Sequence, residues 1–107
     1  MNDEMKRLVD DAAKLLGLTP ITLLMSGAVL CSDGSSVGVK FNPLDPERGD
    51  LMRVAMAAEL VISFSLGRVI PNNYRIPEES FTKGDHDSLA IAVLRAASAV
   101  LKARGDA

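Results

Sequence analysis

The chain lacks tryptophan and has a single tyrosine, cysteine and histidine among its 107 residues. With so few aromatic residues it has no stacking platform for the bases of a single-stranded nucleic acid. Its one cysteine, Cys31, cannot form an intrachain disulfide, which is typical of a reducing compartment. One histidine is too few for the converging ligands of a zinc or iron site. Asp85-His86-Asp87 is therefore predicted to cap a helix, and no metal or cofactor is predicted.

A positive net charge and long apolar runs are also absent. The net charge is −2 and the isoelectric point about 5.3, so no overall positive field attracts DNA or anionic lipid. No apolar stretch approaches the roughly 20 residues that span a membrane, and the N-terminus is unlike a signal peptide. The sequence predicts one cytoplasmic domain, residues 1–107, with no direct contact to DNA or membranes.

Motifs of catalysis are missing as well. The chain has no Gly-x-Ser-x-Gly elbow, no phosphate-binding Walker loop and no Gly-x-Gly-x-x-Gly turn. Cys31 lies in an apolar segment, where a buried, inert thiol is the usual case. The sequence predicts a protein without enzymatic activity and without catalytic residues.

Apolar periodicity is what the sequence does offer. Apolar residues recur at helical spacing from Asp3 to Leu16, with Asn2 or Asp3 as the cap, and again from about Asp87 to Ala103. Residues 19–26 fit either a short helix or a strand, and the helix is favoured because Thr-Pro begins the segment and Gly ends it.

Alternating patterns predict the strands. Residues 28–41 form a predicted hairpin that turns at Asp33-Gly34, and residues 60–66 form a further strand. Val69 and Ile70 are expected to pair back as a short edge strand before a long loop, residues 71–86. The fold class is therefore α+β: a small, mainly antiparallel sheet of about three or four strands with helices packed on both faces, an α/β/α sandwich.

The stretch FNPLDPER, residues 41–48, has two readings. Two prolines hold Asn42 and Asp45 in place, as they would in a ligand site. Each residue also suits a joint between a strand and a helix: Asn42 is extended before proline, Asp45 is an N-cap, and Pro46 opens the helix. The joint is favoured, with Asp45 as a structural cap.

The last predicted helix is apolar around most of its circumference. An ordinary surface helix confines its apolar stripe to one face. A helix that is apolar this far round must be covered on more than one side, and in so short a chain a second subunit can supply part of that cover. The sequence predicts a homo-oligomer whose interface contains Leu94, Ala97 and Leu101.

The candidate binding residues lie near the end of the second strand pattern. They are Arg68, Asn72, Asn73, Tyr74 and Arg75. Arginine and tyrosine are enriched at binding hot spots, and arginine with asparagine suits an anion such as phosphate. Two prolines stiffen the segment. It is predicted to bind a ligand or partner, and a solvated loop is the alternative.

Two stretches of the chain, FNPLDPERGDLMRVAMAAEL and DHDSLAIAVLRAASAV, resemble the phage ABA sandwich domain family, over about residues 37–101. FNPLDPERGDLMRVAMAAEL is similar to the strand end and helix of that family's core motif, through Phe41, Asn42, Pro43, Leu44, Leu51, Val54, Ala55 and Leu60. DHDSLAIAVLRAASAV resembles its closing helix, through Ala92, Val93, Arg95, Ala96 and Ala97. The resemblance implies a phage or prophage accessory protein in the host cell cytoplasm, with no catalytic residues to carry over.

The function expected from this resemblance is to antagonise a host antiviral defence without catalysis. One hypothesis is an oligomeric sponge that sequesters an anionic nucleotide immune signal. A second is a protein-binding inhibitor of a host defence complex, similar to anti-CRISPR proteins. A third is a structural or accessory phage protein with no role against defence.

Overall fold

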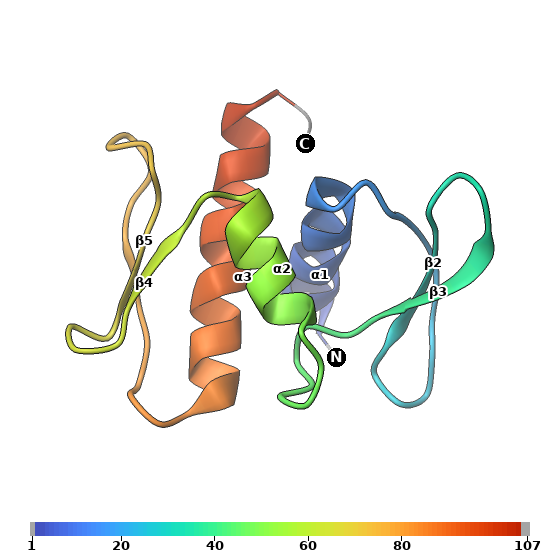
Figure 1. Cartoon of the computed structure of the whole chain (residues 1–107), viewed down its shortest axis with the longest axis horizontal. Coiled ribbons are helices and arrows are strands. Elements are labelled where there is room, and N and C mark those ends of the chain that lie inside the picture. The colour runs from blue at the N-terminus through green and yellow to red at the C-terminus, as the bar shows by residue number, and fades with distance from the viewer. Residues whose placement is uncertain (1, 106–107) are drawn as a thin grey trace.

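A computed structural model describes residues 2–105 (Figure 1). In that range the elements are α1 (Asp3–Leu15), β1 (Thr19–Leu23), β2 (Val29–Ser32), β3 (Val37–Phe41), α2 (Asp50–Ala57), β4 (Val61–Ser63), β5 (Arg68–Ile70), β6 (Glu79–Ser80) and α3 (His86–Ala103). They build two antiparallel three-stranded sheets, β1-β2-β3 and β4-β5-β6. The predicted α+β class is confirmed.

The layer order is the main difference from the predicted sandwich. Instead of one sheet between helices, the helices form a central layer with one sheet on each side (Figure 1). The first sheet contacts α1 through β1, whereas α3 contacts β5 and β6. Each sheet is built from strands that are neighbours in sequence, and α2 lies in the connection from β3 to β4. The two hairpin patterns therefore close separately and do not join edge to edge.

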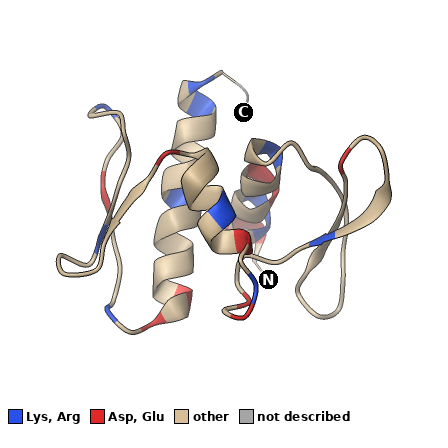
Figure 2. Cartoon of the chain, viewed as in Figure 1, with Lys and Arg blue, Asp and Glu red and all other residues tan. Residues whose placement is uncertain are grey.

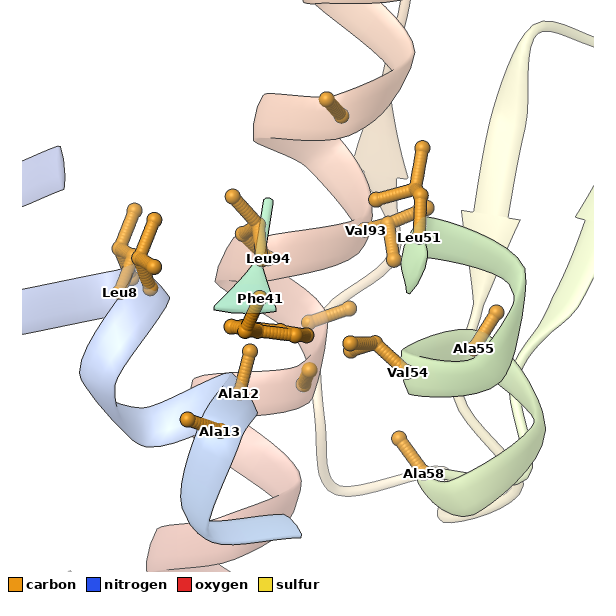
Figure 3. Close-up of a cluster of buried hydrophobic side chains, with 14 of the residues drawn as sticks. Leu8, Ala12, Ala13, Phe41, Leu51, Val54, Ala55, Ala58, Val93 and Leu94 are labelled. Atoms are coloured by element: carbon orange, nitrogen blue, oxygen red, sulfur yellow. The ribbon is translucent and has the colours of Figure 1, made fainter. Parts of the chain in front are cut away.

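The core lies where the three helices meet. Phe41, at the end of β3, is surrounded by Ala12 of α1, Val54 of α2 and Leu94 of α3 (Figure 3). All four are buried. Small alanines on the helices let these elements approach closely, so a single phenylalanine fills the centre.

The predicted subunit interface on α3 is wrong. Leu94 and Ala97 are 0% exposed and Leu101 is 2% exposed within the single chain. The reason is the layer order: α1, α2, β5 and β6 together cover α3 on several sides. The wide apolar circumference of this helix is satisfied inside one chain, and it no longer indicates an oligomer.

Residues 19–26 form a strand and a turn, so the favoured helix is wrong. Thr19 pairs with Ser32 and Leu23 with Val29 in the antiparallel ladder, with a bulge between Pro20 and Thr22. The bulge and the edge position accommodate a proline that cannot donate to a ladder. Cross-strand pairing has overridden the local helix signal.

Strand β5 is central in its sheet, although it was predicted at an edge. It pairs with β4 on one side and with β6 on the other, and Val69 is fully buried. Pro71 follows the strand and so does not interrupt its ladder. The segment predicted as a continuous loop, residues 71–86, returns along β5 and contributes β6.

The joint at residues 41–50 is structural, but Asp50 anchors it and Asp45 does not cap the helix. Helix α2 begins at Asp50, with Gly49 at the N-cap position and no side-chain cap. Asp45 instead accepts a hydrogen bond from the Glu47 N–H at 2.9 Å in a turn. The prediction failed because the turn continues through Arg48 before the helix can start.

Asp50 ties the strand end to the helix start. Asp50 is 3% exposed, and its carboxylate accepts from the Asn42 N–H at 2.9 Å. Arg48 Nε donates to it at 2.7 Å, and Arg53 Nη1 at 3.4 Å. One buried charge therefore holds the residues on both sides of the double-proline turn.

The predicted ends of the two long helices are confirmed. Asn2 caps α1 by accepting from the Met5 N–H at 2.8 Å. Asp85 caps α3 by accepting from the N–H groups of Asp87 and Ser88, at 3.0 and 3.2 Å. The first hairpin also turns where predicted, and there the backbone N–H groups of Ser36 and Ser35 lower the pKa of Asp33 to about 2. Within residues 2–105, no helix has the length and apolar character to cross a membrane.

Candidate functional site

Residues 71–76, here named the recognition loop, connect β5 to the segment before β6. Pro71 is buried and fixes one end of the loop. The Asn73 side chain accepts from the Arg75 N–H at 3.0 Å, and the Ile76 N–H donates to the Asn73 carbonyl at 2.9 Å. These contacts hold the loop in one turn conformation, so the ordering cost of a binding event is lowered.

Tyr74 and Arg75 form an exposed pair at the tip of this loop. Tyr74 is 91% exposed. The Arg75 guanidinium lies 5.7 Å from the centre of the tyrosine ring, and its Nε donates to the tyrosine hydroxyl at 3.4 Å. Among residues 2–105 Arg75 forms no ion pair. The pair presents an aromatic face and an unneutralised cation to solvent.

Arg68 does not join this group. It lies at the start of β5, and its guanidinium pairs with Glu78 at 3.8 Å. The sequence placed Arg68 and Arg75 in one anion site, but strand β5 and the turn of the loop lie between them. The predicted set is therefore divided: Asn72, Asn73, Tyr74 and Arg75 belong to the recognition loop, and Arg68 belongs to a separate surface ion pair.

Two hollows border the recognition loop. One, of about 570 Å³, lies between the loop and the segment at Pro77 and Glu78. The other, of about 150 Å³, lies on the side of α2 and α3, is open to solvent, and is here named the helix-end cavity. Its polar lining is Glu59, Asn72, Asn73 and Arg104, and its apolar lining includes Ile76 and Val100.

Glu59 and Arg104 were not predicted as site residues, and both stand at helix ends. Glu59 follows α2, and its carboxylate accepts from Asn72 Nδ2 at 3.3 Å. Arg104 follows α3, and its Nη2 donates to the Ala57 carbonyl at 3.2 Å. A sequence signal for Glu59 did exist, because a charged residue occupies the position after a helix where glycine is usual.

Glu59 has a left-handed backbone, with φ of +56°. The same position after α1 and after α3 is taken by Gly17 and Gly105, with φ of +74° and +81°. At α2 the N–H groups of Leu60 and Glu59 close the helix on the carbonyls of Ala55 and Met56. An L residue is strained in this conformation, by roughly 1–2 kcal/mol. Glu59 therefore places a charged side chain at a position where its own backbone is strained.

Glu59→Gly is expected to stabilise the protein by about 1 kcal/mol, because glycine adopts the left-handed backbone without the steric cost. For a domain of this size, that gain raises the melting temperature by about 4–8 °C. Differential scanning calorimetry measures the shift.

Gly17→Ala is the matched control at the end of α1. Nothing lies within 4 Å of the added methyl group, so its effect reports backbone conformation alone. It is expected to lower the melting temperature. A Glu59→Gly variant no more stable than the parent would show that the backbone at Glu59 is not strained.

Charges elsewhere do not form a field of one sign. Figure 2 shows acidic and basic residues interspersed along the helices and loops. Cys31 is buried, and this burial, followed by the charges of Asp10 and Asp50, raises the pKa of its thiol. A thiol in this environment stays protonated at neutral pH and is a poor nucleophile. The candidate site is therefore the recognition loop with the two hollows that border it.

The chain matches no protein-family model, and comparison with curated proteins and with solved structures finds no similar protein.

Proposed function

We propose that this protein is a non-enzymatic binding protein that antagonises a host antiviral defence by binding a host protein through its recognition loop. The observation that carries the proposal is the exposed Tyr74–Arg75 pair on an anchored turn. Tyrosine and arginine are the residue types that most often carry binding energy at interfaces. The resemblance to phage ABA sandwich proteins is what supports a target in the host.

A protein partner suits these contacts better than an anionic nucleotide. A nucleotide signal carries phosphates, which need converging cations. Arg68 is already paired with Glu78, so one of the two predicted cations is engaged. The carboxylates of Glu59 and Glu78 border the loop on its two sides and disfavour a multiply charged anion. Sequestration of a nucleotide is therefore kept as the alternative outcome of the experiment described next.

Replacing both Tyr74 and Arg75 with alanine is expected to abolish capture of the host partner. Tagged protein expressed in defended cells is purified, and co-purifying protein is quantified against the tagged chain. A near-stoichiometric partner should accompany the parent and be lost from the double variant. Because both side chains are on an exposed loop, the melting temperature should change by no more than a few degrees.

Met25→Ala with Lys40→Ala is the matched control, since it removes one exposed large side chain from the turn between β1 and β2 and one exposed cation from β3. This control should retain the partner. Capture that survives the loop substitutions would contradict the proposal. Nucleotide released on denaturing the parent, with no protein partner, would favour the sponge.

A further inference from the structure

We propose that the helix-end cavity binds a zwitterionic small molecule, an α-amino acid with a small apolar side chain. This site is distinct from the exposed Tyr74–Arg75 pair and does not depend on the proposed protein partner. The proposal is carried by two opposite charges that line one small cavity without neutralising each other, together with the strained backbone of Glu59.

Each of the two charged side chains is engaged by a neutral partner. Glu59 is engaged by the amide of Asn72, and Arg104 by the main-chain carbonyl of Ala57. In residues 2–105 neither takes part in an ion pair, with the other or with any third group. Opposite charges on long side chains around one hollow would ordinarily be free to pair directly. Here each forms a hydrogen bond to a neutral group instead, so both charges remain available to a bound molecule.

The position of Glu59 strengthens this argument. Two of the three helices end in a left-handed glycine, and only α2 ends in a left-handed glutamate. Strain of this kind persists where the surroundings impose it, and it clusters at binding sites. A carboxylate at this position projects from the end of α2 into the cavity lining, where glycine would leave no acceptor.

The volume of the cavity and its apolar lining indicate the class of ligand. A volume of about 150 Å³ is the size of an engineered cavity that holds benzene. It suits an amino acid with a few side-chain carbons. Ile76 and Val100 contribute apolar surface to the lining, which favours an aliphatic side chain over a charged one.

The ligand's orientation follows from the donors and acceptors. Its ammonium group donates to the Glu59 carboxylate and to the Asn72 Oδ1, which remains an acceptor because Asn72 uses its Nδ2 toward Glu59. Its carboxylate accepts from the Arg104 guanidinium and from the Asn73 amide. Both ligand charges are used, so removing either one should weaken binding.

The test is a titration of the purified full chain, followed by two-dimensional NMR. The probes are L-valine, L-valinamide, N-acetyl-L-valine and inorganic phosphate. Valinamide keeps only the cation, and N-acetylvaline keeps only the anion. Valine is expected to shift the signals of Glu59, Arg104 and the side-chain amides of Asn72 and Asn73. It should bind roughly tenfold or more tightly than either single-charge analogue, because each lost contact is a charge-assisted hydrogen bond.

Two neutralising variants assign the contacts. Glu59→Gln and Arg104→Gln keep side-chain size and should each weaken valine binding roughly tenfold or more. Glu78→Gln and Lys102→Gln are the controls, because these groups are charged neighbours that do not line the cavity. They should leave valine binding unchanged. Calorimetry on each variant verifies that it is folded.

Several outcomes would overturn the proposal. These are no shift with valine, equal binding of valine and valinamide, phosphate binding in its place, or unchanged valine binding by Glu59→Gln. The proposed function is tested separately, since partner capture is scored on Tyr74 and Arg75. Loss of capture in that double variant with no valine binding would leave the protein partner standing and remove the cavity ligand. Valine binding by the parent, with capture unaffected by the loop substitutions, would support the cavity ligand and remove the protein partner.

Discussion

Asp50→Ala is expected to lower the free energy of unfolding by about 3 kcal/mol. Removal of the carboxylate breaks a charge-assisted bond worth about 1.5–3 kcal/mol and leaves the Asn42 N–H without its acceptor, which costs about 1–3 kcal/mol. Arg48 and Arg53 are partly exposed and regain water, so they add less. Urea denaturation followed by circular dichroism gives the change.

Asp45→Ala is the matched control, five positions earlier in the same turn. Its carboxylate accepts one bond, from the Glu47 N–H in an exposed setting, so its loss should cost no more than about 1 kcal/mol. Equal losses at the two positions would contradict Asp50 as the anchor. A larger loss at Asp45 would restore the helix cap that the sequence favoured.

The same comparison distinguishes the two readings of residues 41–48, a ligand site or a joint between a strand and a helix. If Asp50 anchors the turn, its carboxylate is committed inside the fold and is closed to an external ligand. Arg48 and Asp50 would then both have structural roles. Besides its contact with Asp50, Arg48 donates through Nη2 to the Lys40 carbonyl at 2.9 Å. Pro43 and Pro46, which stiffen this segment, would then shape the connection from β3 to α2.

Leu94→Glu is expected to unfold the protein, and Leu94→Ala to destabilise it by about 2–5 kcal/mol. Leu94 is fully buried in the cluster around Phe41 (Figure 3), so a carboxylate there has no water and no partner. Circular dichroism and size-exclusion chromatography with light scattering measure folding and mass together.

Leu66→Glu is the control at an exposed leucine, 67% accessible in the turn after β4. It should change stability by no more than about 0.5 kcal/mol. A Leu94→Glu variant that remains folded but has a lower mass than the parent would show that Leu94 lies in a subunit interface. That result would support the predicted subunit interface and overturn the assignment of Leu94 to the core.

Both long helices and the first hairpin were determined by the sequence alone. Their signals are local: apolar spacing, an oxygen-bearing cap at Asn2 or Asp85, and a turn at Asp33-Gly34. Each of these is satisfied by residues within a few positions of one another. Physical interactions over so short a range are visible in the order of the residues.

The rest was decided by contacts between distant residues. Strand β1 depends on pairing with β2, and the central place of β5 depends on β6 returning beside it. The wide apolar face of α3 was read correctly as needing cover. Only the packing of α1, α2 and the second sheet revealed that the cover comes from the same chain.

The candidate site divides in the same way. Tyr74 and Arg75 could be chosen from residue type and from the prolines around them, because an exposed pair of neighbours needs no distant partner. The helix-end cavity could not, because Glu59 meets Asn72 across 13 residues and Arg104 meets Ala57 across 47. Contacts between residues this far apart in sequence depend on how helix ends and loops pack in three dimensions. The order of apolar and polar residues along the chain does not reveal them.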